Sequence, residues 1–146
     1  MTSPAQSRDP EADDLLTPTN AALLIIDLQP VRVASIVSME RRELVANVAA
    51  VKATGRRKLI MVALWTEVCL AFPALDALRE GVDVYPVVDA VGGTSLVAHA
   101  AGLARIQQAG GRPISWIQLV CEFQRDWNRW ETVEGFSDIV FASIHP

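Results

Sequence analysis

Residues 59–69 read Leu59-Ile60-Met61-Val62-Ala63-Leu64-Trp65-Thr66-Glu67-Val68-Cys69, an apolar run followed by a short turn that ends in a cysteine. The apolar run is typical of a strand buried on both faces of a parallel sheet, and the turn leads into a helix. In open α/β folds, ligands bind at the carboxyl edge of the sheet, where such a turn lies. Cys69 is therefore a candidate nucleophile, because backbone N–H groups at a helix start favour thiolate over thiol. On spacing alone, an inert buried cysteine is the more common alternative.

The composition of the chain is that of one globular domain. Of its 146 residues 51% are hydrophobic, and we expect a flexible N-terminal segment at 1–14 before a single domain at 15–146. The 13 basic and 17 acidic residues give a net charge of -4, which argues against nucleic acid and anionic membrane as partners. No apolar run is long enough to cross a bilayer or to form a secretory leader, which predicts a cytoplasmic protein. The two cysteines and two histidines match neither a disulfide framework nor a zinc pattern.

Apolar runs and helical patterns alternate along the chain. Strands are predicted at residues 21–26, 59–64, 82–88 and 113–117. Helices are predicted at residues 39–54, 67–79, 95–109 and 119–130. This alternation predicts an α/β fold of three α-β-α layers, with a Rossmann-like parallel sheet of about four strands and right-handed crossovers.

Polar residues follow the predicted strands at the carboxyl edge of the sheet. Asp27 follows the first strand, Cys69 the second and Asp89 the third. A carboxylate at the end of a central strand is desolvated, which suits it to exchange a proton with a neighbouring thiol, so Asp27 is the strongest partner for Cys69. An aspartate that caps the next turn is an equally common alternative. Asp89 and the glycine pair at 92–93 lack the lysine and glycine spacing of a phosphate loop, and predict a turn into a helix at Ser95.

Several segments of the chain, in a fixed order, resemble one known family. They are residues 23–30 (Leu-Leu-Ile-Ile-Asp-Leu-Gln-Pro), 64–69 with 71–75, 89–95, and 124–127 (Gln-Arg-Asp-Trp). Together they resemble the isochorismatase-like cysteine hydrolases, in their YcaC-like branch, over about residues 16–138. Ordered blocks of this kind are far more specific than one motif, and the resemblance now favours a reactive Cys69 over an inert one. It implies a shortened isochorismatase-like version of the fold predicted above.

The resemblance also implies a catalytic arrangement. Cys69 attacks the carbon of a small amide or ester-type substrate, and Asp27 carries the proton. The backbone N–H groups of Trp65 and Cys69 form the oxyanion hole, with a cis peptide bond between Leu64 and Trp65.

Further contacts and cofactors follow from the same resemblance. Gln29 and Thr66 are candidate substrate contacts, although a turn hydrogen bond explains Gln29 equally well. Relatives that bind zinc use histidines shortly after the first strand, and no histidine lies between Asp27 and Cys69. We therefore expect no metal and no cofactor.

The chain departs from the family in one region. Relatives have a longer segment between the first helix and the cysteine strand, and this segment carries a Lys or Arg that completes the triad. Here residues 41–48 resemble that first helix and residues 50–58 resemble the helix end before the cysteine strand, as if an internal deletion joined them. No basic residue stands in a matching position. Lys52 and Arg32 are alternative cations that spacing does not test, and His99 is predicted on a helix face.

Three functions remain open at this point. The first is a cysteine hydrolase, with activity reduced by the loss of the basic residue. The second is a catalytically inactive remnant that acts as an oligomeric scaffold or interaction protein. The third is a small-ligand-binding domain that uses the glycine turn at Gly92. Because a deletion exposes or rebuilds a sheet edge, and unpaired edges associate, we also predict a homo-oligomer.

Overall fold

The sheet consists of three parallel strands in the order β1-β2-β3. The structure is a computed structural model that describes residues 14–26 and 53–144. Its strands are β1 (Ala21–Ile26), β2 (Lys58–Ala63) and β3 (Asp83–Pro86). All six residues of the central strand β2 are buried, as its continuous apolar run predicts. In the register of the sheet, Ile26 at the end of β1 lies opposite Ala63 at the end of β2.

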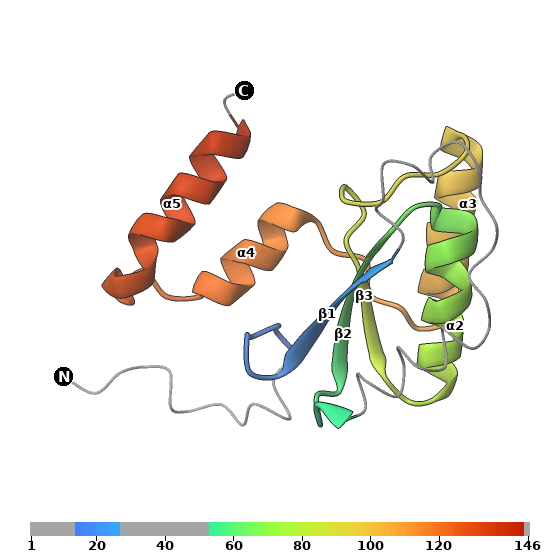
Figure 1. Cartoon of the computed structure of the whole chain (residues 1–146), viewed down its shortest axis with the longest axis horizontal. Coiled ribbons are helices and arrows are strands. Elements are labelled where there is room, and N and C mark those ends of the chain that lie inside the picture. The colour runs from blue at the N-terminus through green and yellow to red at the C-terminus, as the bar shows by residue number, and fades with distance from the viewer. Residues whose placement is uncertain (1–13, 27–52, 145–146) are drawn as a thin grey trace.

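The helices follow the strands in the predicted alternation (Figure 1). A single π-helical turn, η3 (Thr66–Leu70), continues directly into α2 (Ala71–Arg79). The next helix, α3 (Leu96–Gln108), follows β3 and is capped by Ser95, whose hydroxyl accepts a hydrogen bond from the Ala98 N–H. The two C-terminal helices are α4 (Trp116–Gln124) and α5 (Trp130–Ile144). The α/β class and the parallel sheet are therefore confirmed.

Two predicted elements near the C-terminus differ in the structure. Instead of a strand at 113–117, the chain forms a single parallel bridge between Val87 and Ile114. Pro113 has no N–H to give to a ladder, and Ser115 already caps α4, so only one residue is left to pair. The predicted helix at 119–130 is confirmed only over residues 119–124, which belong to α4. It breaks after α4 at Arg125, whose φ of 56° is left-handed, and a second helix begins at Trp130.

Helices from different parts of the chain cover the two faces of the sheet. On one face, α2, α3 and η3 enclose a core that contains Leu59, Met61, Leu70 and Ile106. Figure 1 shows α2 and α3 on the same side of the sheet and α4 on the other. The second core consists of buried residues on the α4 side of the sheet, with Trp116, Leu119 and Phe123 packed against it. Its members are Leu16, Ala21, Ile60, Val62, Tyr85, Val87 and Ile114.

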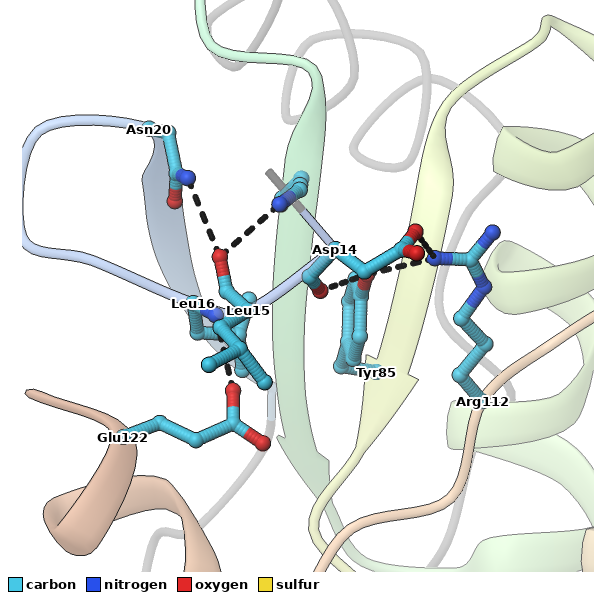
Figure 2. Close-up of polar contacts among 8 residues, drawn as sticks. Asp14, Leu15, Leu16, Asn20, Tyr85, Arg112 and Glu122 are labelled. Carbon is cyan, nitrogen blue, oxygen red and sulfur yellow. Dashed lines mark hydrogen bonds and ion pairs between the residues drawn. The ribbon is translucent and has the colours of Figure 1, made fainter. Parts of the chain in front are cut away.

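Residues 14–16 close the second face by polar contacts with distant parts of the chain (Figure 2). The fully buried Leu16 donates its N–H to Glu122 Oε2 at 2.7 Å, and the Leu15 carbonyl accepts from Lys58 Nζ at 2.9 Å. Arg112 Nη1 contacts Asp14 Oδ1 at 3.3 Å and the Tyr85 hydroxyl at 3.0 Å. Burial raises the pKa of Tyr85, although the Arg112 guanidinium acts in the opposite direction. The segment just before β1 is thus held in place by side chains of Glu122, Lys58 and Arg112, which contact its backbone and the Asp14 carboxylate.

Several sequence predictions fall outside the described residues. They include most of the helix expected at 39–54, the region of the inferred deletion, and residues 1–13 of the flexible segment expected at 1–14. Among the helices that the structure does describe, none combines the length and apolar character needed to span a membrane.

Candidate functional site

Cys69 lies at the carboxyl end of β2, inside the turn η3. Its residue is 3% exposed and the thiol is free rather than paired in a disulfide. Cys69 belongs to the core on the α2 side, together with Leu70 and Ala71. The strand, turn and helix therefore follow one another as the opening sequence predicts, and they carry the thiol to the sheet edge at which α/β folds bind ligands.

The backbone just before Cys69 has an unusual connection. The peptide bond between Leu64 and Trp65 is cis, which confirms that prediction. Leu64 also forms a parallel bridge with Gly92, and the Thr66 N–H donates to the Gly92 carbonyl at 2.8 Å. The loop after β3 is thereby fixed against the turn that carries the cysteine.

The Thr66 side chain forms a hydrogen bond with a histidine of α3. Thr66 is completely buried, and its Oγ1 lies 2.8 Å from His99 Nδ1. This hydrogen bond connects the first residue of η3 with the first turn of α3. The Thr66 hydroxyl, a candidate substrate contact, therefore points to a neighbouring helix within the protein.

A second polar contact joins the same two regions. Glu67 Oε1 accepts hydrogen bonds from both the hydroxyl and the amide of Thr94, the amide at 2.9 Å. Burial opposes ionisation of this carboxyl, but the Thr94 hydroxyl and amide and the charge of His99 together lower the pKa of Glu67 below its ordinary value of 4.5. The other oxygen, Oε2, is buried and has no hydrogen-bond partner among the described residues. A charged carboxylate is thus held in place two residues before the cysteine.

Two glycines allow these contacts to be so close. A Cβ on Gly93 would lie 2.8 Å from both Glu67 Oε2 and His99 Cβ. A Cβ on Gly102, which lies in α3 one turn after His99, would lie 2.9 Å from the Glu67 Cα. Both distances are shorter than normal contacts, so only glycine lets α3 pack directly on the backbone of η3. The glycine-rich turn at 92–93 serves this packing.

Other predicted site residues are only partly placed by the structure. Asp27 and Gln29 lie outside the described residues, as do the alternative cations Arg32 and Lys52. Asp89 is described, and its Oδ1 accepts the N–H of Trp116 at 2.8 Å. It therefore supports the start of α4, in keeping with its prediction as a turn residue rather than a phosphate ligand.

Two contacts of the site were missed by sequence reasoning. His99 was given a weak claim on the site and was expected to lie on a helix face, and no partner was expected for Glu67. The available signal was the spacing of Ser95 to His99, since a capped helix start places His99 in the first turn of α3, next to the strand ends. No group of three metal-ligating side chains occurs in the described part of the chain.

Comparison with known proteins gives the site a family context. Residues 48–118 match the isochorismatase domain. The probable hydrolase YcaC of Escherichia coli is 42% identical over 92 residues, which are 63% of this chain and 43% of YcaC. Mouse isochorismatase domain-containing protein 2A is 33% identical over 75 residues, 49% of this chain and 36% of that protein. The chain thus matches less than half the length of these curated relatives.

Solved structures of two YcaC proteins share the fold. YcaC from Pseudomonas aeruginosa, determined with hexane-2,5-diol and covalent acrylamide, superposes with a TM-score of 0.68 at 25% identity, covering 88% of this chain and 96% of that one. E. coli YcaC, an octameric hydrolase of unknown specificity, gives a TM-score of 0.69 at 23% identity, with 90% and 97% covered. By the family model, the sequence identity and the shared fold, the chain is similar to the isochorismatase-like hydrolases, in their YcaC-like branch.

Proposed function

We propose that the protein is a cytoplasmic hydrolase that uses Cys69 as its nucleophile on a small amide or ester-type substrate. The observation that carries this proposal is the position of Cys69 in η3, directly after the central strand β2. Its partner in the proposal is Asp27, which follows β1. Ile26, the residue before it, lies opposite Ala63 in the register of the sheet. The carboxyl ends of β1 and β2 therefore lie at the same edge of the sheet.

The proposed reaction proceeds through a thiol-linked intermediate. Asp27 takes the proton of the Cys69 thiol as the sulfur attacks the substrate carbonyl carbon. The carbonyl electron pair moves onto oxygen, where the N–H groups of Trp65 and Cys69 stabilise the charge. Collapse of this tetrahedral species expels the amine or alcohol, which takes a proton from Asp27. Water then attacks the thioester while Asp27 accepts a proton from the water. The acid product leaves as the C–S bond breaks, and Asp27 returns that proton to the Cys69 sulfur. Gln29 is the proposed substrate contact.

The structure of one relative contains a covalently bound electrophile. Acrylamide is an electrophile that thiolates attack, and covalent acrylamide is present in the P. aeruginosa YcaC structure. The proposal extends this reactivity to Cys69. Because no basic residue of this chain matches the family's third catalytic position, we propose a slower reaction than in relatives that have one.

The inactive-scaffold alternative has its own support. In α5, none of residues 130–143 is buried, although the helix carries Trp130, Ile139 and Phe141. Apolar residues exposed in this number indicate an interaction surface. Homo-oligomer formation is part of the proposal for either function, and E. coli YcaC is octameric.

Two matched serine variants test the proposed chemistry. The parent chain, Cys69→Ser and Cys121→Ser are assayed against a panel of short-chain amides and esters, and treated with acrylamide before peptide mass spectrometry. We expect acrylamide on Cys69, a loss of turnover of about a thousandfold in Cys69→Ser, and a change below about twofold in Cys121→Ser. Equal turnover in parent and Cys69→Ser contradicts a Cys69 nucleophile. No turnover and no Cys69 adduct in an oligomeric parent supports the scaffold instead.

A further inference from the structure

The residue that starts the cysteine turn is fixed at its side chain and at both backbone groups. The Thr66 N–H donates to the Gly92 carbonyl at 2.8 Å, and the Thr66 carbonyl accepts the Ala71 N–H. Its hydroxyl hydrogen bonds to His99 Nδ1 at 2.8 Å. Thr66 is 0% exposed, so none of these contacts exchanges with water.

His99 is itself held rigidly at the start of α3. Its N–H donates to the Ser95 carbonyl at 2.9 Å, and the Ser95 hydroxyl caps the same turn through the Ala98 N–H. The close approach of α3 at Gly93 and Gly102 leaves no room for the helix to shift toward η3. The imidazole is therefore supported by a backbone that packs directly on the turn it contacts.

We propose that His99 is a positioning residue for the Cys69 thiol, acting through the hydroxyl of Thr66. This rests on the proposed function, since it assigns a role in presenting the nucleophile. Thr66 lies three residues before Cys69 in the same single turn, and it directly follows Trp65, the other proposed oxyanion donor. Releasing Thr66 shifts the donor and the nucleophile together. A displacement of about 1 Å at a reacting centre costs up to about a hundredfold in rate.

The direction of the effect separates positioning from simple structural support. If His99 only closes the core, its loss loosens η3 and exposes a buried thiol, so alkylation of Cys69 becomes faster. If His99 positions the thiol, its loss makes Cys69 slower. Cys121, which is exposed on α4, reports in the same sample on the quality of the reagent, and circular dichroism reports on global unfolding.

The test compares the rates at which iodoacetamide alkylates Cys69 and Cys121, resolved by peptide mass spectrometry, in two matched pairs of variants. His99→Leu and Thr66→Val remove the hydrogen bond, whereas His99→Asn and Thr66→Ser retain a polar atom near the original position. We expect the Cys69:Cys121 rate ratio to fall about tenfold in the first pair and to stay within about twofold of the parent in the second.

A double variant completes the experiment. Because both substitutions break the same bond, His99→Leu/Thr66→Val is expected to have the same rate ratio as either single variant. An unchanged or raised ratio in His99→Leu overturns the proposal, as does an additive double variant. Each variant is checked for native circular dichroism. If either His99→Leu or Thr66→Val unfolds, the other of these two variants supplies the test. The parent ratio reports separately on the proposed function, since a parent Cys69 no faster than Cys121 argues against the hydrolase.

Discussion

Cys69 and Cys121 lie in regions that are packed in different ways. Around Cys69, the turn η3 has Thr66 and Leu70 fully buried and is joined to α3 through His99. Around Cys121, α4 has Gln124 as its buried residue, and α5 extends beyond it with an exposed surface (Figure 1). The comparison teaches that the sequence blocks at 64–69 and 89–95 lie at the tightly packed edge of the sheet, where small shifts of the backbone matter. In the C-terminal helices α4 and α5, by contrast, Gln124 is the one buried residue among 116–124 and 130–143.

Glycine substitutions in the two regions give the largest expected contrast. Gly102→Ala places a methyl group 2.9 Å from the Glu67 Cα and 3.2 Å from the Thr66 carbonyl carbon, and backbone atoms cannot move aside easily. We expect a loss of about 1–3 kcal/mol in the free energy of unfolding, measured by urea titration. Gly135→Ala in α5 meets nothing within 4 Å and should stabilise the helix by about 0.5–1 kcal/mol. A neutral Gly102→Ala contradicts the close packing of α3 on η3.

The Thr94–Glu67 contact gives a smaller, pH-dependent effect. Thr94→Val removes the hydroxyl bond but leaves the amide bond to the carboxylate, and we expect it to cost about 0.5–1.5 kcal/mol at pH 7. The pKa of Glu67 is lowered in the folded chain, so its contribution is complete above the ordinary 4.5 and is lost as the pH falls through the lowered value. The difference between parent and Thr94→Val should therefore shrink in acid.

Thr94→Ser is the control for this prediction. It keeps the hydroxyl and should follow the parent across the same urea titrations at pH 7 and in acid. A Thr94→Val deficit that grows as the pH falls would show that the neutral form of Glu67 is the one stabilised.

The smallest expected effect on stability is in α5. Phe141→Ser and Ile139→Ser change side chains that are 62% and 56% exposed. At low protein concentration we expect the free energy of unfolding to change by less than about 0.5 kcal/mol. Sedimentation at high concentration should show weaker self-association, because these side chains form the proposed contact surface. A loss above about 2 kcal/mol in dilute solution would mean that α5 packs within the chain.

Much of the fold was predictable because local pattern and tertiary structure agree. The apolar runs at 21–26 and 59–64 correspond to β1 and β2, and the capped pattern at 95–109 corresponds to α3. The break between α4 and α5 could not be predicted, because the helical periodicity of the sequence continues across residues 119–130. The break depends on Arg125 in a left-handed conformation, and on the buried Gln124, whose Nε2 donates to the Asp126 carbonyl.

The candidate site was predictable at Cys69 but not in its supporting contacts. The position of Cys69 follows from consecutive residues of one strand and turn. The contacts of Thr66 with His99 and of Glu67 with Thr94 join residues 33 and 27 positions apart, which no local period encodes. They depend on the close packing of α3 against η3, which the glycines Gly93 and Gly102 allow. A glycine in a sequence is consistent with such a close approach but does not identify the segment that approaches.

The most direct test of a reactive Cys69 is its alkylation rate relative to Cys121 in the unmodified protein. The two thiols are treated together with a limiting amount of iodoacetamide at pH 7, and the labelled peptides are quantified over time. Accessibility alone favours the exposed Cys121 over Cys69, which is 3% exposed. A Cys69 presented as a nucleophile should nevertheless react about tenfold faster. If Cys121 is labelled first and Cys69 reacts only on unfolding, Cys69 is a core residue and the proposed hydrolase mechanism is wrong.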